Sequence, residues 1–244
     1  MTGSGVTTSE ITVSTTDGPM RLHEARPAGD ARAAVVVVQE AFGVNAHIQD
    51  VTRRVAEAGY HAVAPEFFHR SGPGAVVEYG NFEKVLEYFK DVSGDEAILH
   101  DVDGALDHLR AAGFTDDRIG IVGFCFGGRV TFLVALRRAL GAAVGFYGGG
   151  IVTGRFPQFP PLVAETPSLQ TPWLGLFGDQ DASIPVDDVE QLRAALHAAS
   201  VDNDVVRYAD AGHGFHCDQR PDYRPDDARD AWSRTLAWFG AHIG

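Results

Sequence analysis

One cysteine of this sequence stands where enzymes place an exposed nucleophile. Cys125 lies in GFCFGG, residues 123–128, directly after the apolar run RIGIV. A G-x-nucleophile-x-G pattern at a strand-to-helix turn holds the side chain on strained backbone, and the turn requires small neighbours. The helix that follows points N–H groups and its positive dipole end at the sulfur, which favours the thiolate. A buried structural cysteine is the alternative, but the glycines favour a nucleophile.

A base and an acid follow this cysteine along the chain. His213 lies in the loop after the last predicted strand, and a histidine exchanges a proton near neutral pH. The segment FGDQDASIP offers Asp179 and Asp181 as acids that hold the imidazole in one tautomer. Asp181 is further out on its loop, but spacing alone leaves the choice open. The order nucleophile, acid, histidine is that of α/β-hydrolases.

Two further groups near these residues have open interpretations. Glu40 ends a buried strand, where a carboxylate is costly unless paired. It is either a capped or solvated loop acid, or a proton partner or gate beside the nucleophile. His216 and Cys217 stand close to His213 and could suggest zinc. Because metal sites need more ligands at defined spacing, we expect no metal and no cofactor.

The elements that must position these residues alternate along the chain. Two short alternating segments, 11–15 and 20–27, flank a hairpin turn at Asp17-Gly18. A loop rich in proline and phenylalanine spans 150–171. The apolar patterns predict strands over 33–40, 61–68, 118–124, 142–149, 172–179 and 203–210, and helices over 47–58, 76–90, 96–112, 126–140, 186–199 and 226–243.

This alternation predicts an α/β fold, a three-layer sandwich with a mostly parallel sheet of about eight strands and helices on both faces. We expect a flexible tail over 1–9 and a single domain over 10–244. Ligands of such sheets bind beyond the carboxyl ends of the strands. The residues at these ends are Gln39, Glu40, Pro65, Glu66, Cys125, Tyr147, Asp179, Gln180, Asp181 and His213.

Composition restricts the partners and the compartment. The net charge of -13 argues against nucleic acid and against anionic membrane surfaces. Two cysteines cannot form a disulfide framework, and no apolar run approaches the length of a spanning helix. The N-terminal residues have no basic start and no apolar core of a secretory signal. We therefore expect a cytoplasmic protein with reduced thiols, a monomer or weak homodimer, that acts on a small molecule.

Several segments together resemble the dienelactone hydrolase family of α/β-hydrolases, from about Glu10 to the end of the chain. The resemblance implies an α/β-hydrolase fold without a large cap domain, and a triad of Cys125, His213 and Asp181. It thereby selects Asp181 over Asp179. The segments that carry it are QEAFGVN, IQDVTRRVAEAGYHAVAPEFF, GFCFGG, GDQDASIP and AGHGF.

The resemblance also implies a mechanism, and we add candidate residues for the pocket. A glutamate matching Glu40 holds the resting thiol in this family, and the oxyanion donors match the backbone N–H groups of Ala41 and Phe126. The implied reaction is hydrolysis of an ester or lactone through a thioester. The candidate substrate-binding residues are Phe42, Tyr147, Phe215 and Lys84, with Phe68 and Trp173 as further possible walls.

The sequence departs from the family where arginines bind the carboxylate of chlorocatechol-derived lactones. One of these arginines closely follows the catalytic histidine in the family, and its position is Cys217 here. The other belongs to the helical stretch that matches residues 76–91, which offers only Lys84 and Lys90. Arginine and lysine are not interchangeable for bidentate carboxylate binding. Arg220 and Arg224, further along the same loop, are candidates to replace them.

Two other function classes remain as alternatives. Thiol proteins with a glutamate beside a cysteine elbow, on a flavodoxin-like sheet, act on glyoxals or as redox sensors. They lack a late aspartate and histidine, whereas this chain has both. A degenerate hydrolase fold used as a binding module is the non-enzymatic alternative, and it has no use for an intact nucleophile, acid and base.

Overall fold

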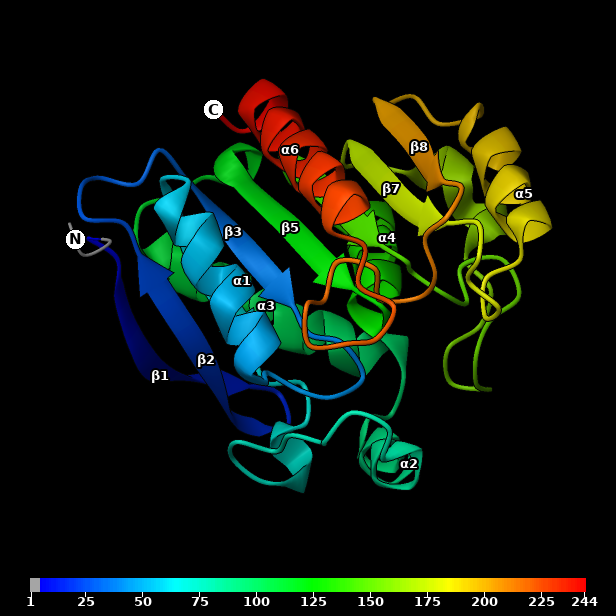
Figure 1. Cartoon of the computed structure of the whole chain (residues 1–244). Helices are drawn as coiled ribbons and strands as arrows, with labels where there is room; N and C mark the ends of the chain where they lie inside the picture. Colours follow the sequence, from blue (N-terminus) through cyan, green and yellow to red (C-terminus); the bar gives the residue numbers. More distant parts are fainter. Residues whose placement is uncertain (1–4) are drawn as a thin grey trace.

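The computed structural model describes residues 5–244, and within them eight strands form one sheet (Figure 1). The strand order is β1-β2-β4-β3-β5-β6-β7-β8. β1 and β2 form an antiparallel hairpin, β2 is also antiparallel to β4, and the remaining neighbours are parallel. The strands are β1 (Thr7–Thr15), β2 (Gly18–Arg26), β3 (Ala33–Val38), β4 (Tyr60–Pro65), β5 (Ile119–Phe124), β6 (Ala142–Phe146), β7 (Trp173–Gly178) and β8 (Asn203–Tyr208).

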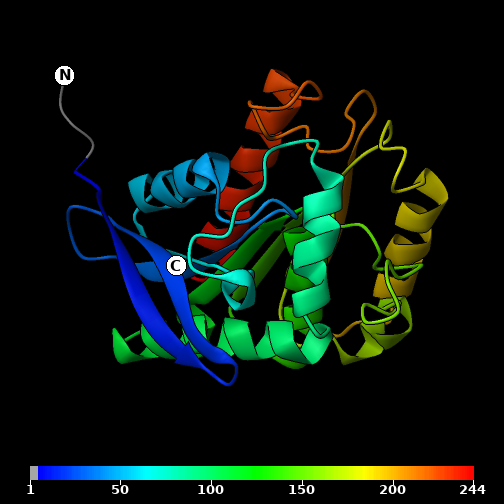
Figure 2. The ribbon, with the colours of Figure 1, turned by 90° about the horizontal axis from the view of Figure 1, so that it is seen from below.

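Helices cover both faces of this sheet. α1 and α6 lie on one face and α3 and α4 on the other, whereas α2 lies beyond one edge of these layers (Figures 1 and 2). The α-helices are α1 (Ala46–Glu57), α2 (Phe82–Asp91), α3 (Asp95–Ala111), α4 (Phe126–Arg137), α5 (Val186–Leu196) and α6 (Pro225–His242), and the short 3₁₀ helices are η1 (His69–Ser71), η2 (Asp116–Arg118) and η3 (Val163–Ser168).

The central strands are apolar because helices cover them from both sides. Every residue of β3, β5, β6 and β7 is buried, as expected for parallel strands in a three-layer fold. This arrangement confirms the predicted fold class, an α/β-hydrolase fold with a mostly parallel sheet. None of the helices in residues 5–244 is both long enough and apolar enough to cross a membrane.

Some predicted boundaries are wrong for local reasons. The strand predicted over 61–68 ends at Pro65, because the N–H of Phe67 donates to Gln39 Oε1 at 3.1 Å instead of to a neighbouring strand. The helix predicted from 76 begins at Phe82, because the Asn81 side chain accepts from the N–H of Lys84 and caps it there.

The predicted N-terminal tail is also too long. β1 begins at Thr7, and its pairing with β2 starts at Thr7 and Arg26. The prediction of a flexible tail is therefore wrong for residues 7–9. Residues 1–4 of that tail lie outside the described residues.

Candidate active site

The turn after β5 presents Cys125 in the conformation that the glycine pattern predicts. Cys125 has φ 56° and ψ -114°, a left-handed conformation that is strained for any residue but glycine. A Cβ atom at Gly123 would lie 2.2 Å from Gly127 O, and one at Gly127 would lie 2.5 Å from Val38 O. One at Gly128 would lie 2.4 Å from Phe146 O. Glycine is thus required on both sides of the cysteine.

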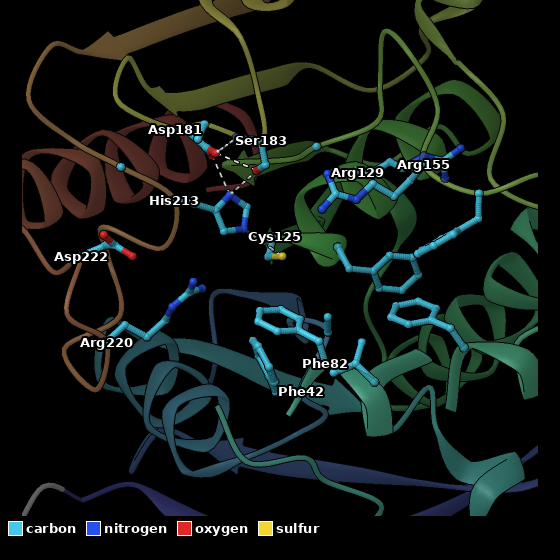
Figure 3. Close-up of a pocket in the computed structure, with 18 of the residues that line it drawn as sticks. Phe42, Phe82, Cys125, Arg129, Arg155, Asp181, Ser183, His213, Arg220 and Asp222 are labelled. Atoms are coloured by element: carbon cyan, nitrogen blue, oxygen red, sulfur yellow. Dashed lines mark hydrogen bonds and ion pairs between the residues drawn. The ribbon is translucent and has the colours of Figure 1, made fainter. Parts of the chain in front are cut away.

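Three predicted residues from separate loops meet at the carboxyl edge of the sheet (Figure 3). Cys125 follows β5, Asp181 follows β7 and His213 follows β8. His213 Nε2 lies 3.1 Å from Cys125 Sγ, and His213 Nδ1 lies 2.6 Å from Asp181 Oδ2. The imidazole therefore bridges the sulfur and a carboxylate, which fixes its orientation and its tautomer.

The structure also separates the two aspartates between which spacing could not decide. The other oxygen of Asp181 accepts from Ser183 N at 2.8 Å and from Ser183 Oγ at 2.7 Å, so this carboxylate is held in place. Asp179 instead accepts from both Nε and Nη2 of Arg207, each at 2.7 Å. Asp181 is thus the acid that contacts His213.

Electrostatics favour an ion pair between the sulfur and the imidazole. Burial opposes ionisation of Cys125, but the charge and hydrogen bond of His213 outweigh it and lower the pKa of the thiol. Burial likewise opposes protonation of His213, yet Cys125 and Asp181 raise its pKa to about 10. Because each partner stabilises the charge of the other, this geometry favours a thiolate beside an imidazolium.

Two backbone N–H groups beside the sulfur can stabilise an oxyanion. Ala41 and Phe126 both line the pocket that contains Cys125. Phe126 is the first residue of α4, so its N–H has no acceptor inside the helix. Among the hydrogen bonds of residues 5–244, neither N–H has an acceptor. This arrangement can hold a negatively charged oxygen on the carbonyl that the sulfur attacks.

Glu40 is fully buried next to this site but contacts other groups. Its carboxylate accepts from the Tyr79 hydroxyl at 3.2 Å and from Arg220 Nη1 at 3.4 Å. The pKa of Tyr79 is raised by burial and by the charge of Glu40, so the phenol stays a donor. Within the described part of the chain, no hydrogen bond joins Glu40 to Cys125. This differs from the resting state that the resemblance implies.

The sulfur opens into a pocket of about 510 Å³. Phe42 and Arg220 line it together with Cys125, Asp181 and His213. The residues that line it come from the loop after β3, α2, the start of α4, the loop after β6, and the loops after β7 and β8.

Three of the four predicted substrate-binding residues lie outside this pocket. Tyr147 and Phe215 are fully buried in the core, with ring centroids 5.4 Å apart. The Tyr147 ring lies 5.1 Å from that of His213, and its hydroxyl has no partner within residues 5–244. Lys84 lies on the outer side of α2, where Nζ pairs with Glu87 Oε1 at 2.8 Å. Phe68 and Trp173 are core residues as well.

A cluster away from this pocket has ligand types that a metal could use. Among residues 5–244, only Glu24, His61 and His108 bring such ligand atoms within 4.8 Å of one another. His61 and His108 contact the same oxygen of Glu24 at 2.8 and 2.9 Å, and Arg26 also donates to it at 3.0 Å. The guanidinium opposes a second cation there, and the carboxylate is already satisfied by these donors.

Sequence reasoning missed several polar residues of the site, among them Ser183, Tyr79, Arg129 and Arg155. Ser183 stands two residues after Asp181, a spacing at which an aspartate commonly accepts from the backbone, so a turn signal was present. Tyr79 contacts Glu40, Asn45 and Cys217 from an irregular loop, and no pattern in the sequence marks it.

Comparison with known proteins gives consistent matches over nearly the whole chain. The model of the dienelactone hydrolase family matches residues 20–243. A "Putative carboxymethylenebutenolidase" of Methylorubrum extorquens is 38% identical over 241 residues, which cover 97% of this chain and 81% of that protein. A "Probable 2-oxo-3-(5-oxofuran-2-ylidene)propanoate lactonase" of Bradyrhizobium is 32% identical over 232 residues, 93% of this chain and 92% of that protein.

Solved structures agree with these sequence matches. The crystal structure of a "Putative Dienelactone Hydrolase" from Klebsiella pneumoniae is 37% identical, with a TM-score of 0.89, and the match covers 97% of this chain and 99% of that one. The "Dienelactone Hydrolase-like Promiscuous Phospotriesterase P91" from metagenomic libraries has a TM-score of 0.77 at 23% identity, which shows a shared fold.

Proposed function

Because the chain belongs to the dienelactone hydrolase family, we propose that it cleaves an ester or lactone through a thioester on Cys125. Membership in this family makes the protein a hydrolase of carboxylic esters. The observation that supports the proposed residues is the chain of contacts from Cys125 Sγ through His213 to Asp181, at 3.1 and 2.6 Å.

The first half of the proposed reaction transfers the acyl group to sulfur. The Cys125 thiolate attacks the carbonyl carbon, and the N–H groups of Ala41 and Phe126 bind the oxyanion. When the intermediate collapses, the carbon–oxygen bond of the ester breaks, and the leaving oxygen takes the proton from His213 Nε2. The products of this half are the alcohol or opened ring, a neutral imidazole and the thioester.

The second half releases the acid. With the thiolate consumed, His213 loses the charge that raised its pKa, so the imidazole becomes a competent general base. It takes one proton from water, and the oxygen attacks the thioester. The carbon–sulfur bond breaks, which restores the thiolate and the imidazolium and releases the carboxylic acid. Asp181 stabilises the imidazolium in both resting and final states.

The test is turnover of p-nitrophenyl acetate by purified protein and by a pair of thiol variants. Cys125→Ala should lower kcat by roughly 10⁴-fold, because the nucleophile is lost. Cys217→Ala removes the other thiol, which is buried and outside the pocket, and should keep kcat within about threefold. Mass spectrometry of the quenched wild-type protein should show an acetyl group on Cys125. Retention of full rate by Cys125→Ala would refute the proposed nucleophile.

A further inference from the structure

The pocket continues beyond the reacting sulfur as an apolar arm. Four residues of α2 form one side of it, and their spacing places them on one face of that helix. Two aromatic residues from the loop after β6 line the same pocket, which also contains Arg129 and Arg155. These six residues, which define the apolar arm, are Phe82, Val85, Leu86, Phe89, Phe156 and Phe159.

The inner part of the apolar arm is a fixed aromatic floor. The ring of Phe89 lies 5.9 Å from that of Phe159 and 4.8 Å from that of Phe126, the residue that follows the nucleophile. Phe126 and Phe159 are themselves 5.4 Å apart. The rings support one another at distances typical of aromatic pairs, so this surface is preformed.

The outer part of the apolar arm is uncovered. Phe82 is 61% exposed and Leu86 is 48% exposed, although both side chains face the pocket. They account for two of the three large apolar side chains that are exposed within residues 5–244. Apolar surface gathered at the mouth of a pocket marks a binding surface for an apolar group.

The direction of the apolar arm shows which half of an ester it would hold. Phe82 lies on one side of Cys125 and His213 lies on the other (Figure 3). The leaving oxygen must face His213 to receive its proton, so the acyl group extends away from that histidine and toward α2. A pocket of about 510 Å³ lies within the range of roughly 300–1,000 Å³ that holds drug-sized ligands.

We propose that the apolar arm binds a long or aromatic apolar acyl group, so that the substrate class is esters or lactones of such acids. This inference rests on the proposed function for the direction of the acyl group. Val85 and Phe89 form the buried part of the apolar arm, and Phe82 and Leu86 form its exposed mouth.

The first test is a series of p-nitrophenyl esters from acetate to octanoate, which share one leaving group. Burial of each added methylene should raise kcat/KM about twofold, so the octanoate-to-acetate ratio, over six methylenes, should reach roughly 60. The double variant Phe82→Ser, Leu86→Ser should lower this ratio about tenfold, and both positions are exposed enough to tolerate serine. Glu87→Ala, on the outer side of the same helix, should keep the ratio. A flat series in the wild type, or an unchanged ratio in the double variant, would overturn the proposal.

A second measurement needs no catalysis. Titration calorimetry of the Cys125→Ala protein should show 2-nonanone binding at least about tenfold more tightly than 2-butanone, and the serine substitutions should remove the difference. Chain-length-dependent binding without any ester turnover would support the apolar arm and refute the proposed function. Turnover of p-nitrophenyl acetate with no preference for the longer ketone would support the proposed function and refute the apolar arm.

Discussion

At the scale of single residues, the structure pairs the sulfur of Cys125 with His213 and not with Glu40. The sulfur contacts the imidazole at 3.1 Å, while Glu40 is held by Tyr79 and Arg220. Glu40 nevertheless lies close enough for its charge to raise the pKa of Cys125, against the lowering by His213. The reactivity of the thiol therefore depends on which of the two charges acts more strongly on it, and in this geometry His213 does.

This balance predicts the pH dependence of alkylation. Since the pKa of Cys125 is lowered from 9.0, the alkaline limb of iodoacetamide inactivation should have its midpoint below pH 9. His213→Ala removes the cation and should move the alkaline limb of the rate upward, to pH 9 or above. Cys217, fully buried and with its pKa raised by burial to about 11, should remain unlabelled in the native protein. An inactivation limb at pH 9 in the wild type would contradict the ion pair.

At the scale of elements, a buried carboxylate joins the hairpin to the rest of the sheet. Glu24 on β2 accepts from Ser9 on β1, from His61 on β4 and from His108 on α3. Burial would raise the pKa of Glu24, but hydrogen bonds from Arg26, His108 and His61 hold it at about 2. These contacts make the charged form of Glu24 a shared anchor of three strands and one helix.

The anchor predicts a loss of stability that depends on pH. Glu24→Gln should lower the free energy of unfolding by about 2 kcal/mol at pH 7, because the charged acceptor is lost. A depressed carboxyl pKa contributes stability that is complete above about pH 4.5 and is lost as pH falls toward 2, so the difference between wild type and variant should shrink in that window.

The measurement is urea unfolding of both proteins at pH 7 and pH 3. Glu10→Gln is the matched control, since it removes a more exposed carboxylate of β1 that pairs with His23 at 2.6 Å. Its effect should stay below about 1 kcal/mol. If Glu24→Gln lowered the free energy of unfolding equally at both pH values, the contribution of Glu24 would come from its shape and not from its charge.

At the scale of the whole molecule, the sequence predicted the features that regular strands and helices determine. The buried strands appear in the sequence as apolar runs, and the strand-to-helix turn at Cys125 appears as a glycine pattern. The fold and the positions of Asp181 and His213 at strand ends could therefore be predicted. The pocket walls could not, because α2 and the loop around Phe156 reach the site through irregular backbone. Tyr147 illustrates the same limit: it ends a strand at the correct edge, yet its ring points into the core.

One guanidinium in the pocket contrasts with the negative charge of the molecule as a whole. The chain carries a net charge of -13, but such a field is screened beyond roughly 8 Å at physiological salt. Arg220 lines the pocket near His213, with a side chain only 15% exposed and a contact of 3.4 Å to Glu40. A carboxylate on the leaving group would therefore meet this guanidinium at short range, despite the anionic surface.

This contrast predicts a preference that one residue controls. The ratio of kcat/KM for 4-acetoxybenzoate to that for phenyl acetate should fall about tenfold in Arg220→Gln, because a charge-assisted hydrogen bond is lost only for the carboxylated ester. Arg224→Gln is the matched control, since its Nε donates to Asp210 O outside the pocket, and it should keep the ratio. If both esters lost rate in equal proportion in Arg220→Gln, the arginine would act through Glu40 and the sulfur, and carboxylate recognition would have to come from another residue.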